Sequence, residues 1–257
     1  MTAGTRGRSV VQGQPATYLE AGRGQPLVLL HGAGGRAEAW TPQLAGLADV
    51  ARVVAVDLPG HGETGGRGCR SIDEYAAWVL GLLDALGLDR VVLGGHSMGG
   101  GIAQTLALGR PDRLRGLVLV GTGARLRVLP RILELFREGS PAGPELVASL
   151  AYSPRTPPGS VVEAERALRE TATLVTLGDF MACDRFDLMT RLHDVEVPTL
   201  VLGGQDDRLT PPKYAAFLAG AIPGARLVEI EAAGHFAQLE QPDAVNGAIR
   251  DFLTALP

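Results

Sequence analysis

The 257-residue chain has little of what several functional classes require. It has only two cysteines, Cys69 and Cys183, too few for a disulfide scaffold or a cysteine metal cluster. We expect two unpaired thiols, with a single bridge between them as the alternative. Its formal net charge is −4, so no basic field over the whole sequence is expected to attract nucleic acid or anionic lipid. No apolar run reaches about 18 residues, so no segment is expected to span a membrane.

Several signatures of targeting and of bound groups are also missing. The first residues lack the apolar core, about 7–15 residues long, of a signal peptide, which favours a cytoplasmic protein. The sequence contains no H-E-x-x-H motif and no G-x-x-x-x-G-K-[ST] motif, and the Gly32–Gly35 loop lacks the G-x-G-x-x-G spacing of a dinucleotide site. It therefore predicts neither a metal ion nor a cofactor. The 46% of hydrophobic and 20% of charged residues indicate a globular protein with one sizeable core.

The sequence does contain a recurring unit of a short β-branched run, a glycine-rich turn and a helical pattern. Several runs are apolar at consecutive positions, which is typical of parallel strands that are covered on both faces. The alternation predicts an α/β fold with a mostly parallel central sheet flanked by helices. Ser9–Gln12 and Thr17–Ala21 predict an antiparallel hairpin at one edge. The predicted sheet strands are Pro26–Leu30, Arg52–Val56, Arg90–Gly94, Gly116–Val120, Pro198–Gly203 and Ala225–Ile230.

The alternation of strands and helices stops between about Gly123 and Val195. This stretch has helical patterns at Arg131–Arg137, Glu145–Ala151 and Val161–Asp179 but no convincing strand, and proline and glycine interrupt it repeatedly. We therefore predict a helical lid at residues 123–195. It is inserted into a core formed by residues 1–122 and 196–257, with one domain overall.

The segment around Ser97 carries the strongest chemical signal. Gly95, Ser97 and Gly99 form a G-x-S-x-G motif between a predicted strand and a predicted helix. A nucleophilic serine needs this context, because it lies in a strained turn where only small neighbours fit. The N-terminus of the following helix also stabilises negative charge that develops beside the serine. Because the chain is rich in glycine, a G-x-S-x-G motif alone is weak evidence for a nucleophilic serine. The evidence becomes stronger if the sequence also contains the residues that would act together with Ser97.

Three loops after other predicted strands supply such partners. His31-Gly32-Ala33-Gly34-Gly35 follows an early strand, so the N–H groups of Ala33 and Met98 are candidate oxyanion donors. Asp206 or Asp207 follows a late strand and can fix the tautomer of a histidine. His235 follows the last strand and can act as general base. The order of serine, aspartate and histidine is that of α/β-hydrolases.

On these residues, the chain resembles the lidded serine esterase-like branch of the α/β-hydrolase superfamily over nearly its whole length. The matching segments are His31–Gly35, Asp57–Gly62, Gly95–Gly99, Pro198–Pro211 and Gly234–His235. The resemblance implies that Asp207, four residues before a proline, is the acid rather than Asp206. It also implies that Ser97 is the nucleophile, that His235 is the base and that Ala33 and Met98 donate to the oxyanion.

We therefore predict a cofactor-free, metal-free serine hydrolase that cleaves small-molecule carboxylic esters with small to medium, apolar acyl groups. No nucleic-acid or membrane partner is expected, and the oligomeric state is left open. The lid aromatics and methionine either contact the acyl group or only pack the lid on the core. The candidate substrate contacts are Gly32, Phe136, Phe180, Met181 and Phe236.

Two alternatives remain open at the level of the sequence. The first is a carbon–carbon bond hydrolase of ring-cleavage products, or a lactonase or perhydrolase, on the same fold. The second is a receptor-like protein that keeps the fold and binds a small molecule without turnover.

Overall fold

The computed structural model describes residues 4–156 and 162–257 of the chain. It contains an eight-stranded sheet with the strand order β1-β2-β4-β3-β5-β6-β7-β8. β1 and β2 form an antiparallel hairpin, β2 pairs antiparallel with β4, and all other neighbours are parallel. The predicted α/β fold and its edge hairpin are therefore confirmed. The strands are β1 (Thr5–Val11), β2 (Gln14–Ala21), β3 (Pro26–Leu30), β4 (Arg52–Val56), β5 (Val91–His96), β6 (Leu114–Val120), β7 (Thr199–Gly204) and β8 (Arg226–Ile230).

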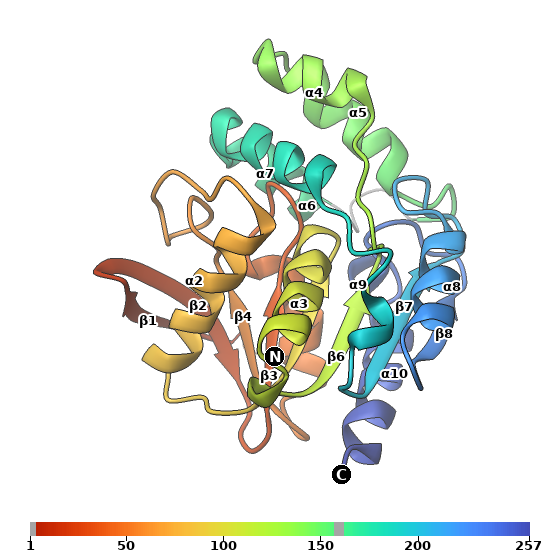
Figure 1. The fold of residues 1–257 in the computed structure, drawn as a ribbon. Coiled ribbons are helices and arrows are strands. Elements are labelled where there is room, and N and C mark those ends of the chain that lie inside the picture. The colour runs from red at the N-terminus through yellow and green to blue at the C-terminus, as the bar shows by residue number, and fades with distance from the viewer. Residues whose placement is uncertain (1–3, 157–161) are drawn as a thin grey trace.

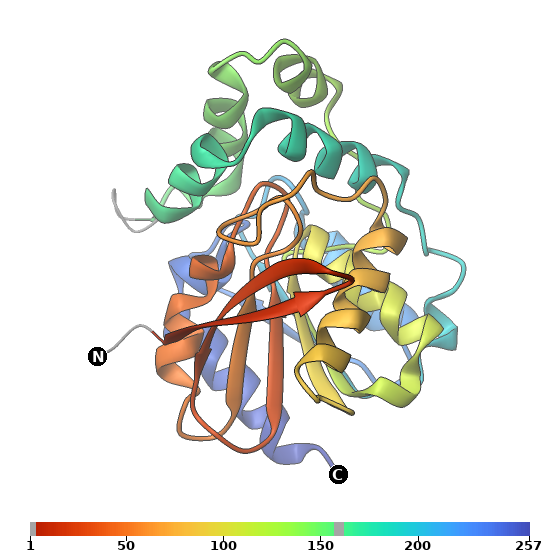
Figure 2. The ribbon, with the colours of Figure 1, turned by 90° about the vertical axis from the view of Figure 1, so that its left-hand side faces the viewer.

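Helices cover both faces of the sheet (Figures 1 and 2). One face packs against α2 (Ile72–Ala85), α3 (Met98–Gly109) and α8 (Pro212–Ala221). The other face packs against α1 (Thr41–Gly46), α9 (Ala237–Glu240) and α10 (Pro242–Ala255).

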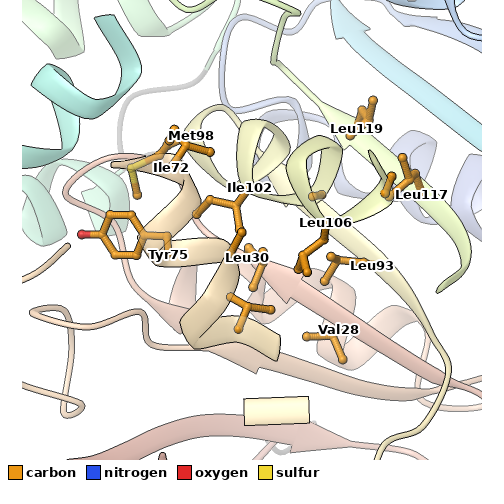
Figure 3. Packing of buried hydrophobic residues seen from close by; sticks show 14 of the residues in the cluster. Val28, Leu30, Ile72, Tyr75, Leu93, Met98, Ile102, Leu106, Leu117 and Leu119 are labelled. Carbon is orange, nitrogen blue, oxygen red and sulfur yellow. The ribbon is translucent and has the colours of Figure 1, made fainter. Parts of the chain in front are cut away.

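Successive residues of a strand point to opposite faces of the sheet, so the central strands need apolar residues at every position. Val28 and Leu30 accordingly belong to the core on the α3 side, and Leu29 to the core on the α10 side. Figure 3 shows the first of these cores, in which Ile102 and Leu106 of α3 lie over the strands. The two cores hold β5 rigidly, and this strand leads directly to Ser97.

Among the described residues, four α-helices and a short 3-10 helix (Leu192–Asp194) lie between β6 and β7, and the α-helices lie over the end of the sheet at which the parallel strands finish (Figure 1). We call residues 123–195 the insert. Its two ends meet, because the Leu188 N–H donates to the Ala124 carbonyl at 2.7 Å. The helices of the insert are α4 (Pro130–Arg137), α5 (Ala142–Ala151), α6 (Val162–Glu170) and α7 (Thr173–Arg185).

The structure corrects one helix prediction in the insert. The pattern Val161–Asp179 forms two helices, α6 and α7, rather than one, and Val161 lies outside the described residues. The chain leaves the helix at Ala172, whose ψ of 127° is extended. The preceding residue, Thr171, uses its hydroxyl to donate to the Gly34 carbonyl of the sheet loop at 3.0 Å. The break between α6 and α7 thus coincides with a contact to the core, and a helical repeat alone does not contain that information.

Two further local features complete the fold. The Ser71 hydroxyl accepts a hydrogen bond from the Glu74 N–H at 3.1 Å and caps α2. Cys69 and Cys183 are both unpaired. Among the described helices, none is both long enough and apolar enough to cross a bilayer.

Candidate active site

Ser97 lies in a sharp turn between β5 and α3. Its φ of 51° and ψ of −114° are conformations that residues with a side chain rarely adopt. A Cβ atom on Gly95 would lie 2.1 Å from the Gly99 carbonyl oxygen, and one on Gly99 would lie 2.4 Å from the Leu30 carbonyl oxygen. Only glycine fits at either position, so the G-x-S-x-G spacing is a packing requirement of this turn.

His235 and Asp207 form a buried hydrogen-bonded pair at the ends of the last two strands. The distance from His235 Nδ1 to Asp207 Oδ2 is 2.9 Å. The other carboxylate oxygen, Oδ1, accepts from the N–H groups of Leu209 and Thr210, both at 2.8 Å. The Thr210 hydroxyl donates to Asp207 Oδ2 at 2.7 Å. Because Nδ1 faces a carboxylate, it carries the hydrogen, and Nε2 of His235 is then an acceptor.

The electrostatics of Asp207 match an ionised carboxylate. Burial alone would raise its pKa, but the charge and hydrogen bond of His235, with the Thr210 hydrogen bonds, lower the pKa below its ordinary value. The neighbouring Asp206 has other partners, since its Oδ2 accepts from the Ser153 hydroxyl at 2.5 Å and from Arg155 Nη2 at 2.9 Å. Of the two aspartates left open by the residue pattern, Asp207 is the one that contacts His235.

The Gly32–Gly35 loop lies beside Ser97. A Cβ atom on Gly32 would lie 3.1 Å from Ser97 Cβ. Ala33 is therefore next to a residue that touches the serine. Met98 is the first residue of α3, so its N–H is one of those that have no acceptor within the helix. Its side chain is fully buried in the core (Figure 3).

Ser97 and His235 line one cavity of about 450 Å³, a volume typical of small-molecule sites. Its lining includes Ala33 and the predicted contacts Gly32, Phe180 and Phe236. The rest of the lining is mainly apolar and comes from both the core and the insert. These further apolar residues are Ala39, Leu126, Val128, Leu129, Pro130, Ile132, Val147, Ala167, Leu168, Leu209 and Pro211.

Two of the predicted substrate contacts lie outside this lining. Phe136 is 3% exposed inside an apolar cluster of the insert, behind Phe180, whose ring lies with its centroid 5.1 Å from that of Phe136. Met181 is 37% exposed on the surface of α7. Phe136 therefore packs inside the insert and Met181 faces solvent, and neither residue lines the cavity.

The cavity also contains polar residues that the sequence analysis missed. Arg127, Arg208 and Lys213 line it together with Tyr214 and Thr210. Arg208 and Lys213 come one and six residues after Asp207. Their closeness in sequence to the predicted acid is the feature that could have indicated a place in the site. Among the described residues, no aspartate or glutamate lines the cavity.

Two buried histidines surround the site without belonging to the Asp207 pair. His96 is 2.9 Å from the His235 carbonyl through Nε2, and burial holds its pKa well below the usual range. His31 donates from Nδ1 to the Gly32 carbonyl at 2.8 Å and accepts from the Leu58 N–H at 3.1 Å. Burial and the charge of His61 lower the pKa of His31 to about 3. Both histidines are therefore neutral supports for the loops of the site.

The donor set of the site is not that of a metal centre. In the part of the chain that the structure describes, no three His, Cys, Asp or Glu side chains gather as metal ligands would.

The chain is similar in sequence and in structure to several known proteins. The profile of a family described as the alpha/beta hydrolase fold matches residues 25–242. A protein of Azorhizobium caulinodans that carries the name of a carbamate hydrolase is 33% identical over 93% of this chain and 96% of its own. The 2-hydroxy-6-oxo-2,4-heptadienoate hydrolase of Pseudomonas putida is 30% identical over 97% and 96%. A thermophilic esterase of Thermogutta terrifontis, solved with malate bound, superposes with a TM-score of 0.87 at 29% identity, covering 97% of this chain and 98% of that one.

Proposed function

Because the chain belongs to the α/β-hydrolase family, we propose that it is a serine hydrolase that cleaves carboxylic esters through an acyl-enzyme. The observation that carries the proposal is the buried Asp207–His235 pair, which shares one cavity with the strained Ser97. A hydrogen-bonded base and acid beside a serine at a helix N-terminus are the parts that acyl transfer requires.

In the proposed reaction the Ser97 hydroxyl oxygen attacks the ester carbonyl carbon, and His235 Nε2 accepts the hydroxyl proton. Asp207 keeps the hydrogen of His235 on Nδ1 and stabilises the positive charge that the imidazole acquires. The N–H groups of Ala33 and Met98 donate to the negative carbonyl oxygen of the tetrahedral intermediate. The intermediate expels the alcohol, which takes the proton from His235. Water then attacks the acyl-enzyme by the same route and releases the acid and the free Ser97.

The lining of the cavity supports an apolar acyl group of small to medium size. Phe180, Leu168 and Val147 of the insert face the cavity with Phe236 of the core. Removing apolar atoms of a substrate from water contributes about 25 cal/mol for each Å² that is buried. In this proposal the insert acts as a lid, because it covers the site and supplies apolar surface to the substrate.

The charges at the cavity support a further feature of the substrate, an anionic group. Arg208 and Lys213 form no ion pair within the described part of the chain. Arg127 donates to the Asp184 carbonyl at 2.6 Å and lies 3.9 Å from its carboxylate, and Arg36, which also lines the cavity, pairs with Glu38 and Glu170. Cations that line a cavity without a carboxylate attract a negative substrate. The names of two relatives agree, since one acts on a dienoate and the other was solved with malate.

A second candidate is hydrolysis of a dienoate of the kind produced by ring cleavage. The 30% identity to the 2-hydroxy-6-oxo-2,4-heptadienoate hydrolase, over nearly the whole of both chains, favours it. The same serine, histidine and oxyanion donors would serve this reaction.

Steady-state kinetics on a substrate panel test the proposal. The panel contains 4-nitrophenyl esters from acetate to octanoate and 2-hydroxy-6-oxo-2,4-heptadienoate, with Ser97→Ala and His235→Ala as control variants. We expect ester hydrolysis that falls roughly 10⁴–10⁶-fold in kcat in either variant. Turnover of the dienoate alone would replace the ester proposal with the second candidate. Tight binding without turnover of any substrate would contradict both and favour the receptor-like alternative.

A further inference from the structure

A fully buried carboxylate that plays no part in the proposed reaction lies on α7 of the insert. Asp179 accepts three hydrogen bonds from three separate segments of the core. The Tyr75 hydroxyl donates to Oδ1 at 2.6 Å, while His61 Nε2 and the Gly34 N–H donate to Oδ2 at 2.8 and 2.9 Å. The side chains of Asp179 and His61 are both 0% exposed.

The contact with His61 is an ion pair. Nδ1 of His61 faces the Pro59 carbonyl at 3.0 Å, and Nε2 faces the Asp179 carboxylate. Both neighbours are acceptors, so both ring nitrogens carry hydrogen. Burial would lower the pKa of His61, but the charge and hydrogen bond of Asp179 raise it above its usual value. The positive charge of His61 thus compensates the negative charge of Asp179, and the hydrogen bond holds the carboxylate in one orientation.

The third partner, Gly34, belongs to the loop that carries Ala33. Both backbone polar groups of Gly34 form hydrogen bonds with the insert. Its N–H donates to Asp179, and its carbonyl accepts from Thr171 Oγ1 at 3.0 Å. Gly34 has φ +65°, and a Cβ atom there would meet Leu168 and Thr176 of the insert at 2.8 and 2.9 Å. The loop is therefore enclosed by α6 and α7 on this side.

On its other side the same loop touches the proposed nucleophile. Gly32 packs against Ser97, as its virtual Cβ contact of 3.1 Å shows. Ala33 lies between a residue that touches Ser97 and a residue that the insert binds through two hydrogen bonds. Few orientations of the Ala33 N–H remain while both contacts are made.

We propose that Asp179 is a positioning residue, which fixes the Gly32–Gly35 loop so that the Ala33 N–H points to the oxyanion site. The insert then has a second role besides covering the cavity, because the oxyanion site is complete only when α7 is docked. This inference rests on the proposed serine hydrolase mechanism.

Steady-state kinetics of variants at Asp179 test the inference, with Tyr75→Phe as the matched control. Asp179→Ala removes the acceptor from Gly34, and we expect kcat to fall about 10–100-fold while KM changes less than about threefold, because oxyanion donors act mainly in the transition state. Asp179→Asn keeps an amide oxygen that can accept from the Gly34 N–H, so it restores most of kcat. Tyr75→Phe removes a hydrogen bond to the same carboxylate without touching the loop, and its kcat stays within about threefold of the wild type. Equal losses of kcat in Tyr75→Phe and Asp179→Ala would contradict the inference.

Amide hydrogen exchange of the Gly32–Gly35 loop gives a second readout that does not depend on activity. We expect faster exchange of the loop in Asp179→Ala and in Thr171→Val, which removes the other hydrogen bond to Gly34. If Asp179→Ala does not fold, Thr171→Val still tests whether hydrogen bonds from the insert slow the exchange of the loop. Exchange at the wild-type rate in folded variants would overturn the inference even if the protein hydrolyses esters. A wild-type protein that hydrolyses none of the panel would instead overturn the proposed function, and the exchange rates would still decide whether Asp179 fixes the loop.

Discussion

Ser97 combines a strained backbone with the position that the proposed chemistry needs. Its φ of 51° is disfavoured for any residue with a Cβ atom, and the turn persists because β5 and α3 are held by the two cores. The strain turns the side chain toward the cavity instead of the core. The strained backbone of Ser97 lowers the free energy of unfolding, and it also exposes the hydroxyl to the cavity.

A comparison of two inactive variants isolates that strain. Ser97→Ala and Ser97→Gly both remove the hydroxyl, but only glycine adopts φ 51° without strain. We expect the glycine variant to be more stable than the alanine variant by about 1 kcal/mol, after the greater freedom of glycine in the unfolded chain is included. Urea unfolding of the two variants measures the difference. A glycine variant that is the less stable one would show that the turn is not strained.

The cationic residues of the cavity lead to a prediction about substrate preference. We expect 4-nitrophenyl pentanoate to be a poorer substrate than an ester of equal length with a carboxylate on its acyl or alcohol part. In the double variant Arg208→Gln/Lys213→Gln, kcat/KM for the anionic ester falls about 30-fold, since each of the two charges contributes on the order of 1 kcal/mol near water. The value for the neutral ester stays within about twofold. Arg23→Gln, an exposed change before β3 at the other end of the sheet, is the control. Equal losses for both esters would contradict the anionic substrate.

At the scale of elements, the short helix α9 organises the loop that carries His235. The Glu240 carboxylate at its end accepts from the N–H groups of Gly234 and Phe236, on either side of the histidine, at 3.0 and 3.1 Å. It also accepts from the Ser153 N–H at 2.9 Å, so it joins this loop to the segment after α5. The carboxylate suits this place because it offers only acceptors to several donors.

Glu240→Gln places an amide N–H₂ group among these donors. We expect the free energy of unfolding to fall by about 2–3 kcal/mol, because at least one buried N–H loses its acceptor. We also expect kcat to fall about 10-fold through displacement of His235. Asp243→Asn removes an exposed carboxylate three residues later and is the control, with a change within about 0.5 kcal/mol. Denaturant unfolding and ester kinetics measure both effects, and similar values for the two variants would contradict this role of Glu240.

The elements differ in how far the sequence predicts them. The strands, the turn at Ser97 and the loops of Asp207 and His235 follow from local patterns, since glycine spacing and consecutive apolar residues reflect constraints within a few positions. Contacts such as Gly34 with Asp179 join residues 145 positions apart, and no local pattern encodes them. Residue type alone does not decide whether Phe136 and Met181 contact the substrate or pack the insert, because the face that each helix presents depends on how the insert packs.

At the scale of the whole molecule, the buried neutral histidines couple stability to pH. His31 and His96 are at most 1% exposed, and burial lowers the pKa of both below the ordinary value of 6.5. As the pH falls below 6.5, the unfolded chain takes up protons at these residues and the folded protein does not. The free energy of unfolding therefore decreases with falling pH. The raised pKa of His61 acts at higher pH, because its contribution is fully present below 6.5 and is lost as the pH rises through its folded value.

We expect a loss of about 3–4 kcal/mol in the free energy of unfolding between pH 7 and pH 5, from two histidines at about 1.4 kcal/mol per pH unit each. The contribution of Asp207, whose pKa is lowered, is lost only at more acidic pH and lies outside this window. Guanidinium unfolding at constant ionic strength measures the loss, and His193→Asn, at a 73% exposed histidine, leaves it unchanged. An unfolding free energy that is constant between pH 7 and pH 5 would mean that His31 and His96 are protonated in the folded protein.

Covalent labelling of Ser97 tests most directly whether this serine is the nucleophile of a hydrolase. The folded protein is incubated with a fluorophosphonate probe and digested, and the modified peptide is identified by mass spectrometry beside a Ser97→Ala variant. We expect modification of the peptide that contains Ser97 and its loss in the variant, because only an activated serine hydroxyl reacts rapidly with the phosphorus. Folded wild-type protein that stays unmodified, or that is modified equally in the variant, would contradict the assignment of Ser97 as the nucleophile.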